Sequence, residues 1–541
     1  MSTVVERLVE AWLDNQTERR YQAAFVQMLV SLGWSVLHST RHSALEYGKD
    51  VVARNPVGEL FAFQLKGNPG SRLTKSEAQG LVPQIEELNK VPLPRNFRRA
   101  RERHHAVLVT NGEIDEEAQT LFALMAEDVG ETTAAISFKW WGRGELVTRF
   151  LSTAGQVWPT SPKGTRTLLN LMAADGKDLP DLTAFTEVLV ETAPVETGKA
   201  SATLLNSRVS STLLISEIAK AKWYEEDNHH ALYQLTIIAT MYVSRFVRGN
   251  KGRRALVRDY ARLVQTHAQD LLREAQNTYF EPSTTWTGGD PLSEIDIMWH
   301  RRNLVAECAA YVLMSKSDEE GGFDIAYARA MVSASLVEPK LWGEGAIPSL
   351  IMRYWSVYKW GGISGEFGLA AILQQLISVS RGHVQNTLSL ASPYYDFTSC
   401  WARSQGAFWL ADPGILEDSF DERMWMARTI LLMLAKRNMK ATCKQIWPDF
   451  SHILHESISM APGDFRDCLL SVDGELISRT YYALTWQELL QEVRELEAGC
   501  DHLSDFEEAP WIVAAYVSIV PYRAWEPVMM WLDRKLCSTW H

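Results

Sequence analysis

The residues best suited to chemistry in this chain are an acid, an amide and a lysine on one predicted β-hairpin. Asp50 lies on a β-rich run from Tyr47 to Ala53, and Gln64-Leu65-Lys66 closes a second run that begins at Leu60. Carboxylate and amide oxygens are ligands that Mg²⁺ prefers, and a lysine ammonium can orient water or neutralise charge on a phosphate. The pattern therefore predicts metal-dependent chemistry on a phosphodiester.

The turn between the two runs sets which side chains meet. With Pro56-Val57-Gly58 as the loop, Asp50 faces Gln64, whereas a four-residue loop places Asp50 opposite Phe63. Gln64 and Lys66 share one face of the strand because they are two residues apart. Opposed side chains lie about 5 Å apart at Cβ. The acid, the amide and the ammonium are therefore expected to converge at one edge of a half-buried sheet.

The predicted metal ligands are the Asp50 carboxylate, the Gln64 amide oxygen and the backbone carbonyl of Leu65, with Mg²⁺ or Mn²⁺ as the ion. Lys66 cannot bind a cation while it is protonated. A helix with a buried stripe at 3.6-residue spacing precedes the hairpin, and it offers Glu18 and Gln22, one turn apart, as further oxygen donors. Glu18 is equally an ordinary first-turn acid that complements the helix dipole.

Four stretches of the chain, taken in order, resemble a known family. They are residues 21–34, 48–52, 63–66 and 106–112, and they resemble the PD-(D/E)xK nuclease superfamily, in particular its Mrr-like restriction-endonuclease branch, where Gln commonly replaces the acid before x-Lys. The resemblance covers residues 15–150 and implies an α/β restriction-endonuclease-like fold and metal-dependent cleavage of DNA, most often double-stranded. It also implies a part in bacterial defence against foreign DNA. The family usually has a Glu where this chain has Gln22.

The predicted elements fit such a fold. Strands are expected at 34–38, 105–110 and 134–140 in addition to the hairpin, and helices at 74–89 and 114–128. Pro83 is expected to interrupt the first of these two helices. This order favours a mixed sheet flanked by helices on both sides.

Basic residues suited to phosphate contacts lie in two places. Arg72 and Lys75 closely follow Lys66 in the sequence. The second place is the segment 94–105, which holds Arg95, Arg98, Arg99, Arg101 and Arg103. Such contacts supply most of the non-specific affinity for nucleic acid. A solvated loop or a contact with an acidic partner explains the same segment equally well.

The remainder of the chain differs in charge and pattern. Residues 1–155 hold 18 Lys+Arg and 19 Asp+Glu, a net charge of −1, whereas the other residues hold 36 and 47, a net charge of −11. Clustered Gly and Pro at 152–166 predict a boundary between a nuclease-like domain at 1–155 and an all-helical region at 163–541. A second boundary at 282–289, which would divide the helical region in two, is left open. An acidic region is unsuited to wrapping nucleic acid. We expect it to regulate the nuclease, to self-associate, or to bind a partner such as an ATPase or a sensor.

Composition indicates the compartment. The six cysteines are scattered with no Cys-x-x-Cys pair, which is typical of buried thiols in a reducing cytoplasm. No apolar stretch is long enough to span a bilayer, and no charged-then-apolar leader is present, so we expect a cytoplasmic protein without a membrane partner.

Two hypotheses from different classes follow. The first is a metal-dependent DNA endonuclease. The second is a nuclease-fold subunit with weak or lost catalysis that binds nucleic acid or serves in assembly. The Gln at position 22 favours the second, and the intact set Asp50, Gln64 and Lys66 favours the first.

Overall fold

The β-hairpin expected from the sequence is present in the computed structural model of the chain. Strand β2 (Val51–Arg54) pairs antiparallel with β3 (Leu60–Lys66), with Val51 opposite Phe63. The amide of Asn55 donates to the carbonyl of Glu59 at 3.0 Å, and Gly58 has a φ of 89°. The loop is therefore Pro56-Val57-Gly58, and of the two predicted registers the shorter-loop register is confirmed.

The structure describes most of the chain, and the chain divides into two compact units, Met1–Ala231 and Leu232–His541. The described residues are 9–10, 12–14, 16–39, 49–68, 70, 72–95, 97–99, 102–130, 133–153, 159, 161–193, 202–246, 251–277, 294–315, 324–337, 343–359, 365–380, 423–458, 477–481, 484–498, 503 and 506–537.

Five strands of the first unit form one mixed sheet in the order β1-β2-β3-β5-β7. The strands β1 (Ser35–Ser39), β2 and β3 are antiparallel, and β3, β5 (His104–Thr110) and β7 (Ala135–Trp141) are parallel. Two-residue strands β4 (Arg72–Leu73) and β6 (Glu113–Ile114) pair with each other beyond the carboxyl ends of β3 and β5. The predicted mixed sheet is confirmed.

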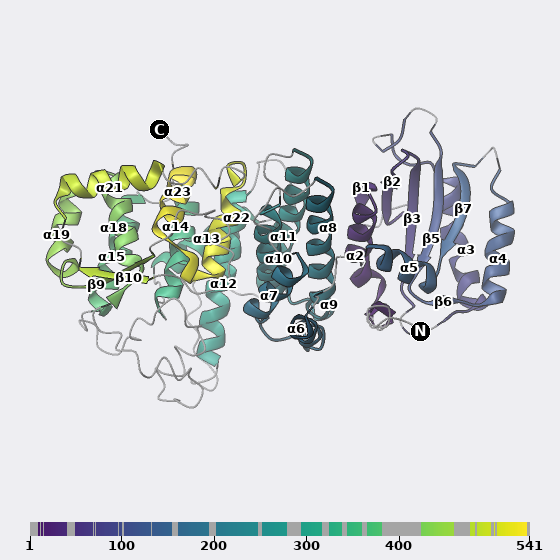
Figure 1. Cartoon of the computed structure of the whole chain (residues 1–541), viewed down its shortest axis with the longest axis horizontal. Helices are drawn as coiled ribbons and strands as arrows, with labels where there is room; N and C mark the ends of the chain where they lie inside the picture. The colour runs from purple at the N-terminus through teal and green to yellow at the C-terminus, as the bar shows by residue number, and fades with distance from the viewer. Residues whose placement is uncertain are drawn as a thin grey trace. The chain divides into compact units, whose positions relative to one another are not determined.

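Helices cover both faces of this sheet (Figure 1). On one face lie α2 (Glu18–Ser31) and α5 (Arg143–Thr153), and on the other lie α3 (Lys75–Lys90) and α4 (Glu116–Glu127). The α2 face is closed by aromatic rings, with Phe25 and Phe63 edge to face at 5.3 Å between centroids. The α3 and α4 face is closed by apolar side chains that include Ala62, Ile85 and Phe122. Successive side chains of β3 point to opposite faces of the sheet, and the helices on the two faces bury both sets.

Helix α3 begins at a capping box and runs through its proline. The Thr74 hydroxyl accepts from the amide of Glu77, and the Glu77 carboxylate accepts from the amide of Thr74. Pro83 lies inside the helix, so the prediction that it interrupts the helix is wrong. Pro83 and Gln79, whose carbonyl loses its helical partner, are both exposed, and water can therefore satisfy that carbonyl.

Among its described residues the first unit also contains the helices α6 (Pro162–Met172), α7 (Leu182–Thr192), α8 (Ala202–Ala219) and α9 (Ala221–Glu225). Helix α8 packs on α2, which therefore lies between the sheet and α8. The predicted boundary at 152–166 falls where α5 gives way to α6.

The second unit is largely helical. Its elements begin with α10 (His229–Ser244), which crosses the division between the units. Further helices are α11 (Lys251–Asn277), α12 (Glu294–Ser315), α13 (Ile325–Val337), η2 (Glu344–Ala346), α14 (Ile347–Lys359), α15 (Gly365–Ser380), α18 (Met426–Lys436), α19 (Lys440–Phe450), α21 (Trp486–Ala498), α22 (Pro510–Ile519), η5 (Pro521–Arg523) and α23 (Glu526–Cys537).

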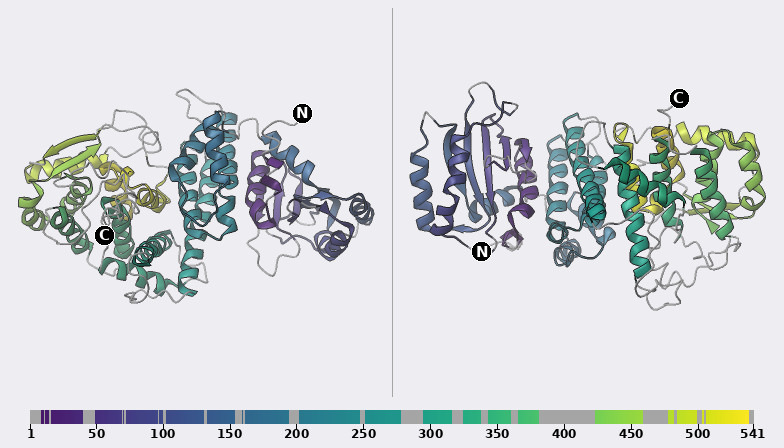
Figure 2. Two further views of the ribbon diagram at one scale, coloured as in Figure 1. Left: turned by 90° about the horizontal axis from the view of Figure 1, so that it is seen from below. Right: turned by 180° about the vertical axis from the view of Figure 1, so that it is seen from behind.

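The second unit also contains strands, so the prediction of an all-helical region is wrong in this respect. Strands β8 (Arg423–Met424), β9 (Leu454–Ile458) and β10 (Ile477–Tyr481) form a small sheet in the order β10-β9-β8. Its longer strands are the yellow-green arrows in the left view of Figure 2. They are two to five residues long and rich in polar residues, and therefore gave no β-rich run in the sequence. The division expected near 282–289 lies outside the described residues. Where helices are described, none combines the length and the apolar character needed to cross a bilayer.

Candidate active site

The hairpin brings Asp50 and Gln64 into direct contact. The Oδ2 atom of Asp50 accepts a hydrogen bond from Gln64 Nε2 at 2.7 Å and a second from the backbone amide of Leu65 at 2.6 Å. Asp50 is 5% exposed and Gln64 is 4% exposed. The carboxylate is therefore almost enclosed, and two N–H donors satisfy its Oδ2 atom.

Gln64 also supplies an unused oxygen. Its Oε1 atom is buried and has no hydrogen-bond partner among the residues that the structure describes. A buried carbonyl oxygen without a donor is uncommon and calls for an unseen partner such as a water molecule or an ion. The Asp50 carboxylate, the Gln64 amide oxygen and the Leu65 carbonyl are hard oxygen donors, which is the donor set that Mg²⁺ or Mn²⁺ takes. In the structure, however, Gln64 Nε2 rather than Oε1 faces Asp50 Oδ2 and the Leu65 carbonyl, at 2.7 and 3.4 Å. The three residue types suit a divalent cation once the Gln64 amide is turned over, which brings its oxygen to the side of the other two ligands.

Lys66 meets Glu18 at the same end of the sheet. The Lys66 ammonium lies 3.3 Å from Glu18 Oε2, and their side chains are 19% and 28% exposed. The other residue considered on α2, Gln22, is 7% exposed and donates from Nε2 to the hydroxyl of Ser39 on β1 at 3.1 Å. Of the two α2 residues considered, Glu18 is thus the one in contact with Lys66.

Tyr21 and Asn111 fix α2 to the strand ends, and sequence reasoning missed both roles. Tyr21 belongs to the buried stripe that the 3.6-residue spacing predicts for this helix, and its hydroxyl also contacts the backbone of Lys66 and of Val109. Asn111, fully buried, donates from Nδ2 to the carbonyls of Leu13 and Gln16, both at 2.7 Å. A tyrosine in place of phenylalanine on an apolar stripe was the one signal in the sequence.

Lys49 is a further buried cation beside Asp50. It is 4% exposed, and its Nζ donates to the backbone carbonyl of Glu87 in α3 at 3.3 Å. Burial lowers the pKa of Lys49 to about 8, and the charge of Glu87 opposes that change. The Lys49 ammonium is therefore directed at the end of α3, and its charge also lowers the pKa of His104.

Arg72 and Lys75 lie on the elements that follow the carboxyl ends of β3 and β5. Arg72 Nε lies 3.0 Å from the Glu113 carboxylate, and Lys75 Nζ lies 3.1 Å from that of Glu117. All four side chains are more than half exposed. Such exposed pairs contribute little stability, and a phosphate can compete for the two cations.

The basic segment lies at the opposite end of the sheet from Asp50 and Lys66. It precedes β5, which runs parallel to β3, so Arg95 and Arg99 sit near the start of β3 while Lys66 sits at its end. Arg54, at the start side of β3, binds the Glu102 carboxylate with two hydrogen bonds, at 2.6 and 2.8 Å. The rise of a strand puts roughly 20 Å between the two ends.

Two arginines of that segment have structural contacts. Arg98 donates from Nε to the carbonyl of Leu93 at 2.7 Å, and Arg103 donates to the carbonyl of Gly130 at 2.6 Å. Arg95 and Arg99 are exposed. Arg101 lies outside the described residues.

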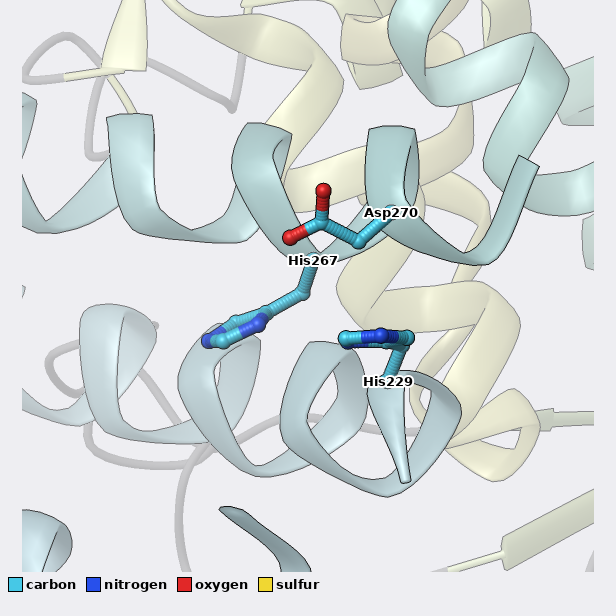
Figure 3. A group of neighbouring side chains, drawn as sticks. All are labelled: His229, His267 and Asp270. Carbon is cyan, nitrogen blue, oxygen red and sulfur yellow. The ribbon is translucent and has the colours of Figure 1, made fainter. Parts of the chain in front are cut away.

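A second group of residue types that bind metals occurs on α10 and α11. Figure 3 shows His267 and Asp270, one turn apart on α11, and His229 in the first turn of α10. The division of the chain falls within α10, between Ala231 and Leu232, so His229 counts with the first unit and the α11 residues with the second. We propose no metal site there.

Comparisons of the chain with protein-family models, with curated proteins and with solved structures returned no match. The geometry of the site therefore carries the functional inference.

Proposed function

We propose that the chain is a divalent-metal-dependent phosphodiesterase that cuts DNA. The observation that carries the proposal is the contact of Asp50 with Gln64 at one end of the sheet, with the Lys66 ammonium on the same strand. Asp50, the Gln64 amide oxygen and the Leu65 carbonyl would hold Mg²⁺ or Mn²⁺. The ion would supply positive charge that polarises the phosphate.

The side chains of the chain have separate tasks in this reaction. Lys66 orients the attacking water and neutralises charge on the non-bridging phosphate oxygens, and Glu18 holds its ammonium in place. Water adds to phosphorus as the bond to the 3′ oxygen breaks, which leaves a 5′-phosphate and a 3′-hydroxyl. This regiochemistry and a role in restricting foreign DNA follow from the family resemblance. Control of the reaction would come from the helical part or from a protein partner such as an ATPase or a sensor.

Cleavage of plasmid DNA by the full chain with Mg²⁺ or Mn²⁺ tests the proposal. We expect metal-dependent nicking or linearisation that falls more than about a hundredfold in both variants. Asp50→Ala removes a ligand of the ion, and Lys66→Ala removes positive charge that stabilises the transition state. Lys139→Ala, which changes an exposed lysine on β7, is the matched control and should cut normally. Cutting that survives Asp50→Ala, or that needs no metal, would overturn the site.

The near-complete burial of Asp50 and Gln64 favours a second candidate, a nuclease-fold subunit that binds nucleic acid without cutting it. In that case the purified chain would retard DNA in a gel-shift assay. It would leave the DNA intact with either metal, even at the highest protein concentration tested. Retardation would then be the same for the wild type and Asp50→Ala.

A further inference from the structure

The hydroxyl of Tyr21 lies where β3 and β5 end side by side. It accepts a hydrogen bond from the backbone amide of Lys66 at 3.1 Å. It also lies 3.0 Å from the carbonyl oxygen of Lys66 and 3.2 Å from that of Val109, either of which can take its single proton. One side chain thus contacts backbone groups of two neighbouring strands at the point where the pairing of these strands ends.

This hydroxyl is buried, and hydrogen bonds and an ion pair hold the chain beside it. Tyr21 is 0% exposed, and it leaves α2 one turn after Glu18, whose carboxylate holds the Lys66 ammonium. The amide of Asn68 donates to Asn111 Oδ1 at 2.7 Å, and this bond fixes the chain just after Lys66. Burial raises the pKa of Tyr21, and the charges of Glu18 and Asp50 raise it further, so the phenol stays protonated at neutral pH. The backbone of Lys66 is therefore held from α2 by a neutral donor and acceptor.

We infer that Tyr21 is a positioning residue for Lys66. It fixes the backbone from which the lysine side chain extends, while Glu18 fixes the ammonium, so α2 sets both ends of the side chain. This inference rests on the proposed nuclease function, in which Lys66 must be aimed at the phosphate. Only the hydroxyl group of Tyr21 has this positioning role, because the ring packs in the apolar core like its neighbours on the buried stripe of α2.

Tyr21→Phe in the full chain tests the inference, since it removes only the oxygen. Misplacement of a reacting group by about 1 Å can cost a hundredfold in rate. We expect kcat for plasmid cleavage to fall about ten- to a hundredfold while KM stays within about twofold. Tyr233→Phe is the matched control, because Tyr233 is also 0% exposed and its hydroxyl has no partner within the described parts of the chain. Its kcat should match that of the wild type.

Amide hydrogen exchange gives a readout that does not need cleavage. In the wild type the Lys66 amide should exchange as slowly as that of Leu65, and in Tyr21→Phe it should exchange at least about tenfold faster while the α3 amides stay unchanged. A Lys66 amide that exchanges quickly in the wild type overturns the inference even if the variant does not fold. Unchanged exchange, or an unchanged kcat in an active enzyme, also overturns it. No cutting by the wild type would instead overturn the proposed function, and the exchange result would then show only that Tyr21 holds the strand.

Discussion

Gly67 lies directly against the backbone amide of Glu18. A β-carbon at position 67 would overlap Glu18 N and would stand 3.1 Å from the carbonyl carbon of Thr17. Both are backbone atoms at the start of α2, so no side-chain rotation can relieve the overlap. The residue after Lys66 must therefore be glycine for the helix to approach the strand end this closely.

Gly67→Ala should thus destabilise the first unit and disturb the pairing of Glu18 with Lys66. We expect a loss of about 1 to 3 kcal/mol in the free energy of unfolding, the usual result of overpacking. Urea unfolding followed by tryptophan fluorescence measures it. Gly80→Ala in α3 is the control, because a β-carbon there meets no described atom within 4 Å, and the helix should gain up to about 1 kcal/mol. Equal stability of the two variants would contradict the close approach.

The two sets of basic residues should differ in their effect on DNA binding. Arg72→Ala with Lys75→Ala removes two exposed charges next to the site, and Arg95→Ala with Arg99→Ala removes two at the far end of the sheet. If DNA lies across Asp50 and Lys66, the first pair should weaken binding several-fold and lower the salt slope by about 2, and the second pair should do less. Fluorescence anisotropy at several salt concentrations measures both. The opposite order would place the DNA away from the candidate site.

His104 should make stability depend on pH. It is 1% exposed and its Nε2 lies 2.9 Å from the carbonyl of Leu88. Burial lowers its pKa from 6.5 to about 4, and the charge of Lys49 adds to this effect. The folded chain therefore prefers the neutral ring, so the stabilisation is complete above pH 6.5 and is lost as pH falls from 6.5 towards 4. The loss is roughly 3 kcal/mol over that window.

Urea unfolding of the wild type and His104→Gln between pH 7 and 4.5 tests this dependence. The wild type should lose its advantage over the variant as pH falls, because glutamine does not titrate. His452→Gln, a change at an exposed histidine, should run parallel to the wild type. Parallel curves for His104→Gln would show that this ring is not the titrating group.

Local chemistry made much of the first unit predictable. The turn residues between the two runs predicted the hairpin and limited its register to two options, of which the structure has the three-residue loop. The period of the apolar residues in α2 marked its buried face. Glu18 and Gln22 could not be distinguished from spacing, because the difference depends on where α2 sits along β3. Gly67 decides that position, through a contact that no local pattern reveals.

Long-range polar contacts were not predictable. Asn111 follows an ordinary strand and reads as turn chemistry, yet it is buried and binds the segment before α2. The sequence did not predict at which end of the sheet the basic segment lies, since this depends on β5 running parallel to β3. In the second unit the short strands β8 to β10 gave no usable period.

The bond from Asn111 to Leu13 joins residues 98 positions apart in the chain. During synthesis the stretch that leads into α2 leaves the ribosome long before the side chain that anchors it. Until β5 has emerged and docked, Asn111 cannot hold the segment before α2, so the place of Glu18 beside Lys66 is not yet fixed. The pairing of Glu18 with Lys66 therefore forms late in the synthesis of the first unit.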